Sequence, residues 1–221
     1  SVTYIGSGAF SSCLSLKEIT LPENVDTVEA NSFSYCRALE KVVLGDNVTL
    51  IGEAAFVGCN SLKSIELPDA LLAIYSHAFS ECSALESISF GSQLILLDER
   101  AFSRCGNLSE IEFAENSSLI RIAAYAFAEC PKLTQVALPE GLVSLGIGAF
   151  NACTELSEVT MPQSLTTVGS GVFNGTKVYN DCLTAGDNII YADNWVVAVE
   201  NRADITELSA NDFKEGTVGI V

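Results

Sequence analysis

Seven of the eight cysteines in this sequence recur at nearly constant intervals, and cysteine side chains can form disulfides or bind zinc. Each lies three residues after a phenylalanine, at Cys13, Cys36, Cys59, Cys82, Cys105, Cys130 and Cys153. An odd number of thiols cannot pair completely, and side chains stacked in one direction fit the torsion of a disulfide poorly. Zinc requires thiolates that converge on one point, which a linear column does not provide. The spacing therefore favours a structural column of buried free thiols.

Other residues that could catalyse a reaction are scarce. His77 is the only histidine, and its place in the pattern is taken elsewhere by residues as different as Gly8, Ala54 and Tyr125. Such tolerance indicates an outward position, and the lack of a second histidine argues against a nucleophile–histidine pair. No glycine-rich phosphate loop is present, because the recurrent Ile-Gly pairs are turn residues. We expect no enzymatic activity, no cofactor and no metal ligands.

Acidic residues form a second column, at Glu23, Asp46, Asp69, Glu115 and Glu140, with Ser92 and Gln163 in the two gaps. Carboxylates that recur once per repeat could collect Ca²⁺, which prefers oxygen ligands. None of them has a second acidic partner in a loop of known calcium-binding type. The sequence favours a solvated rim that keeps the protein soluble, and the cation hypothesis stays open.

The elements that position these side chains come from one internal repeat. A phenylalanine that follows a small residue marks each copy, at Phe10, Phe33, Phe56, Phe79, Phe102, Phe127, Phe150 and Phe173. The spacing is 23 residues, except for 25 residues between Phe102 and Phe127. The two extra residues fall near 116–118, where a polar loop can absorb them. A fixed period of this length predicts a solenoid.

Within one repeat, two kinds of periodicity alternate. Leu62–Leu67 alternates apolar and polar residues as a half-buried strand does, and Pro68 then ends the strand. Leu71 and Ile74 lie on an extended return path. The segment Ala55–Cys59 places its apolar residues three to four apart, which predicts a short helical turn.

The complete unit, L-x-x-I-x-L-P-x-x-V-x-x-I-G-x-x-A-F-x-x-C, is seen from Leu16 to Cys36 and again from Leu133 to Cys153. It resembles the BspA-like leucine-rich repeat. We therefore expect an α/β leucine-rich repeat solenoid, curved and right-handed. A parallel β-sheet would cover its concave face, and short helical turns its convex face. The resemblance also implies an exported or cell-surface protein with a role in adhesion, and it implies no catalytic residues.

The sequence predicts two regions. Residues 1–173 form the repeat array, with seven full rungs after a partial N-terminal repeat, and the chain starts and stops in mid-repeat as an excerpt of a longer protein would. Residues 174–221 form a β-rich interruption with a hairpin near residues 189–199, followed by a degenerate repeat around Phe213 and Thr217. Two residues here stay ambiguous. Cys182 is either exposed and reactive or packed under the hairpin, and Trp195 is either a binding anchor or a core residue.

The predicted binding surface is the outward side of the strands. Its members are short, polar and mildly acidic, namely Glu18, Thr20, Lys41, Glu66, Ser87, Ser89, Glu110, Glu112, Gln135, Glu158 and Thr160. They vary while the core positions do not, as expected where a scaffold presents a surface. With 11 basic and 28 acidic residues, the net charge of −17 argues against nucleic acid and anionic membranes as partners. No apolar run is long enough to span a bilayer.

These observations favour a non-catalytic surface or secreted scaffold that binds a protein partner, such as a host, matrix or other cell-surface protein. The alternative is the repeat region of a larger cell-envelope enzyme whose catalytic domain lies outside this chain. The inner strand face would attract a basic or extended partner.

Overall fold

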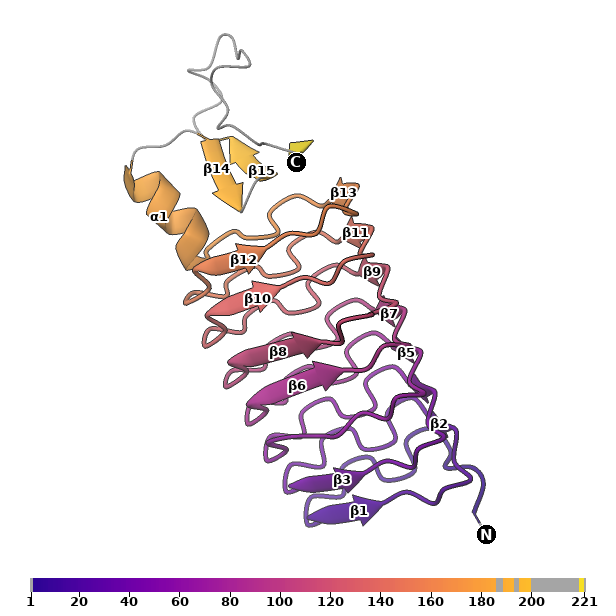
Figure 1. Cartoon of the computed structure of the whole chain (residues 1–221). Coiled ribbons are helices and arrows are strands. Elements are labelled where there is room, and N and C mark those ends of the chain that lie inside the picture. The colour runs from indigo at the N-terminus through magenta and orange to yellow at the C-terminus, as the bar shows by residue number, and fades with distance from the viewer. Residues whose placement is uncertain (1, 186–188, 193–194, 200–218, 221) are drawn as a thin grey trace.

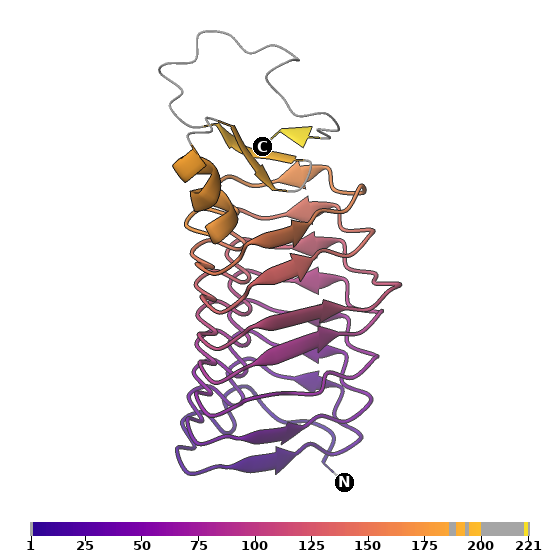
Figure 2. The ribbon, with the colours of Figure 1, turned by 60° about the vertical axis from the view of Figure 1, so that its left-hand side comes forward.

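The computed structural model describes residues 2–185, 189–192, 195–199 and 219–220. The repeats stack as successive coils along one axis, so that equivalent residues of neighbouring coils lie side by side (Figures 1 and 2). The register between paired strands advances by one repeat, as in Ile19↔Val42 and Ile88↔Ile111. The molecule is a parallel β-solenoid of about seven turns, as the repeat period predicts.

The first set of strands comes from the L-x-x-I-x-L segments. It comprises β1 (Glu18–Thr20), β3 (Lys41–Val43), β6 (Ser87–Phe90), β8 (Glu110–Phe113), β10 (Gln135–Ala137) and β12 (Glu158–Thr160). They pair in parallel as β1 with β3, β6 with β8, and β10 with β12. The central side chain of each strand packs inward, and its neighbours point to solvent. We call this solvent-exposed side the strand face.

A second sheet, which the sequence analysis did not predict, forms along the return path. Seven two-residue strands pair in parallel without interruption: β2 (Thr27–Val28), β4 (Leu50–Ile51), β5 (Ala73–Ile74), β7 (Leu96–Leu97), β9 (Arg121–Ile122), β11 (Ser144–Leu145) and β13 (Thr167–Val168). We call it the return sheet. The pairing of Leu97 with Ile122 shows that the two extra residues are absorbed in the loop between β8 and β9, as expected.

The predicted helical turns are wrong. In the coil of Phe56, Ala54 and Gly58 have φ values of 52° and 68°, in the left-handed region. Ala54 and Phe56 donate their backbone N–H groups to carbonyls of the next coil, while Ala55 and Val57 donate to carbonyls three residues earlier. In an α-helix every residue has right-handed φ and ψ, and each N–H donates to the carbonyl four residues earlier. Here, alternate backbone N–H groups instead form hydrogen bonds with the next coil. We call this edge of the solenoid the turn side.

The core is a narrow column between the two sheets and the turn side. Each of the repeat phenylalanines Phe33, Phe56, Phe79, Phe102, Phe127 and Phe150 is fully buried, and its ring stacks on those of the neighbouring coils. Centroid distances along this column lie between 5.0 and 5.9 Å, with nearly parallel ring planes. Buried Leu, Ile and Val side chains fill the space on both sides. No coil could bury its apolar side alone, so stacking creates the core.

The array ends at a helix that the sequence analysis missed. Thr176 replaces cysteine in the column, and its hydroxyl accepts a hydrogen bond from the backbone N–H of Tyr179 at 3.2 Å. This is the N-cap arrangement that starts α1 (Lys177–Ala185). The pairing of Lys177 with Asp181, one turn apart, adds support. A Thr before a Lys-x-x-x-Asp pair was the available sequence signal.

Beyond α1 lie β14 (Ile189–Ala192), β15 (Trp195–Val199) and β16 (Gly219–Ile220). β14 and β15 pair antiparallel, where the sequence predicts a hairpin, and β15 pairs in parallel with β16. The side chains of Cys182 and Trp195, and the whole of Phe213 and Thr217, lie outside the described residues, so those predictions stay untested. Among the residues that are described, no helix has the length and apolarity that a membrane span requires.

Candidate functional site

The structure places the predicted binding residues on one surface, the strand face. Ser87 is half-buried and the other ten are exposed. The parallel register brings some of them directly opposite one another, as Glu18 with Lys41 and Gln135 with Glu158. Ser89 donates a hydrogen bond to the Glu112 carboxylate at 3.0 Å across the β6–β8 pair. The strand face therefore presents mainly polar side chains, with both signs of charge toward its N-terminal end.

The strand face opens at the third coil. The ladder is interrupted between β3 and β6 and again between β8 and β10. At the first break, residues 62–67 match the repeat pattern, yet they form no strand. The structure gives the backbone of Ser64–Leu67 no hydrogen bond to either neighbouring coil. Ile65 still packs in the core, so the coil stays in the stack although the backbone of this segment does not pair with its neighbours.

A groove of about 1040 Å³ lies over this opening. Two of the predicted binding residues, Lys41 and Glu66, line it together, whereas the other nine lie along the strand face outside it. Glu40 and Lys63 add a second charge of each sign, and Val43, 39 % exposed, supplies an apolar wall. The groove can thus offer charged and apolar contacts within one area.

Sequence reasoning did not find the groove. Its lining includes Asn60, Ser61 and Ala84, which lie in the bend before the strand and were not considered. No signal in the sequence marks the opening, because Leu62, Ile65 and Leu67 satisfy the strand pattern as fully as any other copy. The third coil differs instead in its backbone pairing with the neighbouring coils.

The cysteine column is a hydrogen-bond ladder. All seven column thiols are free, and all but the half-buried Cys13 are buried. The Cys82 Sγ donates to the carbonyl of Phe56, in the preceding coil, at 3.1 Å. The Cys59 Sγ donates likewise to Phe33 at 3.2 Å, and the same contact recurs up to Cys153. Each of the six thiols from Cys36 to Cys153 thereby satisfies a carbonyl of the preceding coil and joins two coils.

Burial also suppresses the reactivity of these thiols. Desolvation raises the pKa of Cys59 to about 12, and the nearby Cys36 adds to the rise. Burial likewise raises the pKa of Cys82 well above its ordinary value. The thiolate is the reactive and metal-binding form of cysteine. The column therefore has a structural character, with its thiols held neutral.

This shift predicts a loss of stability in alkali. The folded pKa of Cys59 lies above its ordinary value of 9.0, so the unfolded chain releases thiol protons first as pH rises. The contribution is fully present below about pH 9 and is lost between there and about pH 12. We expect urea midpoints to fall across this window. The Cys59→Ala/Cys82→Ala variant should show a shallower fall, and an unchanged slope would contradict the assignment.

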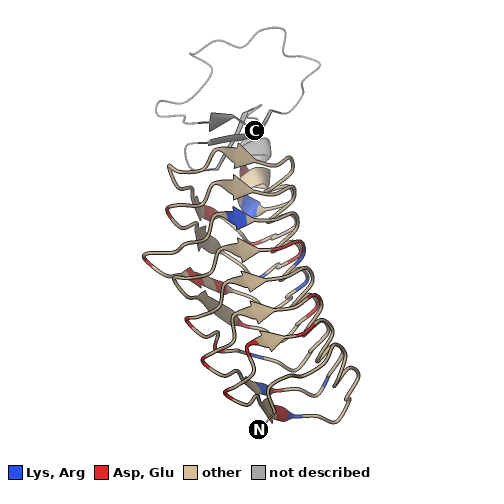
Figure 3. Ribbon diagram, turned by 90° about the vertical axis from the view of Figure 1, so that its right-hand side faces the viewer, with Lys and Arg blue, Asp and Glu red and all other residues tan. Residues whose placement is uncertain are grey.

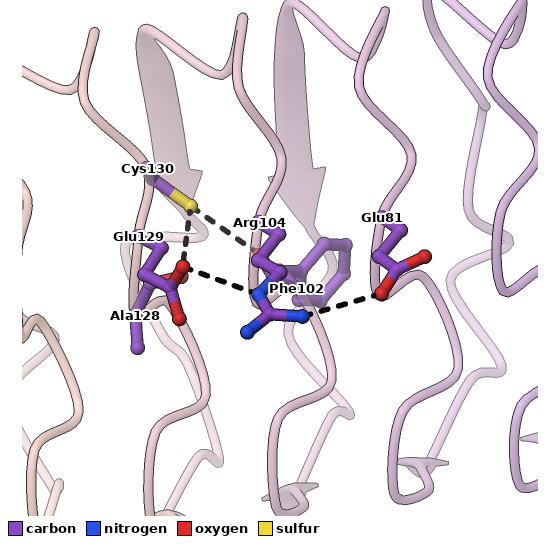
Figure 4. Close-up of polar contacts among 6 residues, drawn as sticks. All are labelled: Glu81, Phe102, Arg104, Ala128, Glu129 and Cys130. Carbon is purple, nitrogen blue, oxygen red and sulfur yellow. Dashed lines mark hydrogen bonds and ion pairs between the residues drawn. The ribbon is translucent and has the colours of Figure 1, made fainter.

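The turn side carries a separate chain of charges. Arg104 lies between Glu81 and Glu129, with Nη1 3.4 Å from the first carboxylate and Nε 3.1 Å from the second (Figure 4). His77 is half-buried and lines a shallow depression of about 520 Å³ with these residues. Exposed ion pairs of this kind contribute little to stability. His77 thus lies in a charged depression that the sequence analysis did not anticipate.

The acidic column lies on the loops that join the two sheets, and all five of its carboxylate residues are exposed. Within the described part of the chain, no three His, Cys, Asp or Glu side chains come close enough to hold a metal ion. Whether the rim collects cations stays untested.

The repeat sequence that forms the strand face, the return sheet and the cysteine column matches a known family. The profile of the family described as "BspA type Leucine rich repeat region (6 copies)" matches residues 1–105 and 73–196. The chain belongs to the BspA-type leucine-rich repeat family. The resemblance seen in the sequence is thus confirmed, and this chain is a leucine-rich repeat scaffold.

Solved structures of bacterial leucine-rich repeat proteins resemble this BspA-type chain. A T. pallidum leucine-rich repeat protein is 34 % identical, with a TM-score of 0.64, over 73 % of this chain and 77 % of its own. One from Bacteroides ovatus is 29 % identical, with a TM-score of 0.70, over 78 % of this chain. One from Eubacterium ventriosum is 32 % identical, with a TM-score of 0.66, over 73 % of this chain.

The BspA-type chain spans only 44 % of the Bacteroides ovatus protein and 43 % of the Eubacterium ventriosum protein. No protein with a curated description matches its sequence.

Proposed function

We propose that this chain is a non-catalytic binding scaffold of an exported or cell-surface protein, and that it contacts a protein partner through the strand face. The observation that carries the proposal is the groove over the third coil. It combines two lysines, two glutamates and an exposed valine on a face otherwise lined by varied polar side chains. Around it, the buried core positions hardly change from coil to coil.

The partner we propose is a polypeptide that lies extended along the strand face, with basic residues toward the C-terminal coils. Glu110 and Glu112 lie on β8, and Glu158 lies on β12, all of them exposed. The aliphatic side chains of such a segment would pack on Val43 in the groove, beside the charged groups of its walls. The strand face, which we take as the concave side, lets one partner touch several coils. The family resemblance supports a host, matrix or cell-surface protein as this partner.

The test begins with capture of partners from an extracellular-matrix extract, followed by affinity measurements on the purified partner. We expect Val43→Ser in the groove, and Glu110→Lys/Glu112→Lys on β8, each to weaken binding at least about tenfold. Added salt should also weaken it, because charge steering is screened beyond about 8 Å at physiological ionic strength.

The matched control neutralises three carboxylates outside the strand face, on the acidic column, in the variant Glu23→Gln/Asp46→Asn/Asp69→Asn. This variant should bind normally. Binding that survives both strand-face variants but is lost in the control would overturn the proposal. A matrix extract that yields no partner for any of them would instead indicate a spacer that holds another domain away from the cell.

A further inference from the structure

Four exposed aliphatic side chains form a line across adjacent coils, on the side of the return sheet. They are Leu72, Ile95, Ile120 and Val143, which are 38, 42, 51 and 42 % exposed. Each directly precedes a strand of the return sheet, from β5 to β11. The backbone N–H of each also donates to the backbone carbonyl of the residue in the same position of the preceding coil, at 2.8 Å for Ile95 and 3.1 Å for Ile120. The side chains therefore lie side by side, one per coil.

We call these four residues the aliphatic stripe, and the fold does not require them to be apolar. The same position holds Asp26 and Thr49 in the earlier coils and Thr166 in the later one. Thr49 and Thr166 make the same backbone bond to their preceding coils as the aliphatic residues do. A polar side chain is thus compatible with this position. Four aliphatic residues in succession, with polar residues at both ends, mark a bounded surface.

Acidic residues border the aliphatic stripe. Asp69, Glu115 and Glu140 of the acidic column lie three to five residues before stripe members on the adjoining loops, and all three are exposed. Figure 3 shows the return sheet as a mostly uncharged band with acidic residues on the loops beside it. Arg121 is the one charged residue within its seven strands. The surface thus offers apolar contacts in the centre, with the exposed Arg121 next to Ile120, and negative charge at the margin.

The charge selects the kind of partner. Two copies of a chain with a net charge of −17 would bring their acidic margins together, and that repulsion disfavours self-association through this surface. A partner with Lys or Arg beside an aliphatic face would instead place opposite charges at the margin.

The spacing of the four stripe residues selects the conformation of the partner. Coils about 4.8 Å apart make the stripe about 14 Å long over its three intervals. Three turns of an α-helix, at about 5.4 Å each, cover about 16 Å, so residues at i, i+4, i+7 and i+11 follow the stripe closely. Alternate residues of an extended strand, about 6.6 Å apart, would cover about 20 Å and lose register. We propose that the aliphatic stripe is a docking surface for a basic amphipathic helix of a partner protein.

The probe is a synthetic 18-residue peptide of leucine and lysine, with leucines at helical spacing, and its affinity is measured by fluorescence anisotropy. The Ile95→Thr/Ile120→Thr variant should raise the dissociation constant about tenfold or more, because apolar contacts at the centre of an interface carry most of its energy. Threonine already occupies this position at Thr49 and Thr166, so the variant should fold. Leu72→Thr/Val143→Thr, at the ends of the stripe, gives a second, independent variant.

The matched control is Leu14→Ser/Ile147→Ser, which removes two aliphatic side chains that are 60 and 51 % exposed outside the stripe. It should bind the helical peptide normally, as should Glu110→Lys/Glu112→Lys on the strand face, so the result is independent of the function proposed above. A peptide of the same composition with scrambled leucine spacing should bind at least about tenfold more weakly. The proposal is overturned if the scrambled peptide binds equally well, or if both stripe variants bind like the control.

Discussion

Phe79→Ala is expected to lower the free energy of unfolding by about 3–5 kcal/mol, the usual range for a buried aromatic residue. Phe79 is fully buried, and its ring centroid lies 5.1 Å from that of Phe56 and 5.0 Å from that of Phe102. Alanine would leave a cavity inside the stack that rigid neighbouring coils cannot close. Urea unfolding measured by circular dichroism gives the free energy.

The effect should begin locally, because the stability of a solenoid is approximately a sum over coils and their nearest-neighbour contacts. Native-state hydrogen exchange should show protection lost first around Phe56, Phe79 and Phe102, with the outer coils retained. Glu86→Ala, an exposed position in the same coil, is the matched control and should change stability by less than about 0.5 kcal/mol. Equal loss of protection in all coils would argue against a nearest-neighbour array.

Gly146→Ala should destabilise the protein by about 1–3 kcal/mol, as overpacking does. A Cβ at Gly146 would lie 2.4 Å from the carbonyl carbon of Ala123 and 2.5 Å from the backbone nitrogen of Ala124. The Gly146 N–H also donates to the carbonyl of Ile122 at 2.8 Å, which holds the two coils at that distance. The coils must separate to admit a methyl group, so the melting temperature should fall.

The control for this substitution is Gly106→Ala. A Cβ at Gly106 would meet nothing within 4 Å, and its φ is not in the left-handed region. Alanine there should stabilise the protein by about 0.4–1 kcal/mol, because it restricts the unfolded chain. The same substitution is therefore expected to destabilise the protein at Gly146 and to stabilise it at Gly106. Two shifts of the same sign would show that the close approach at Gly146 does not limit the packing.

The sequence predicted the stacking, the inward residues and the strand face, because each depends on a period that the chain repeats many times. Phe56 and Phe79 fall on one column whenever the coil length is constant, whatever the local backbone does. Glu110 and Glu112 must likewise face solvent once Ile111 packs inward, since strand side chains alternate.

The turn side could not be predicted in this way. Apolar residues at Ala55, Phe56 and Cys59 fit a helical turn, but spacing alone does not reveal which backbone groups bond within a coil and which bond between coils. Left-handed φ at Ala54 and Arg100, residues without a strong preference for it, arises from that inter-coil bonding. The same limit hid the opening at Ser64–Leu67, because it is a property of two neighbouring coils and not of one.

The inter-coil ladder described for the turn side and the two sheets also has a mechanical consequence. The backbone bonds between coils join each coil to the one before and the one after, so the coils are links in series. A pull along the axis loads every link equally, and the weakest one yields first. Each coil of 23 residues that peels away would release about 80 Å of extended chain at about 3.5 Å per residue. Such an array would dissipate a sudden load in steps and lengthen greatly before its last coils gave way.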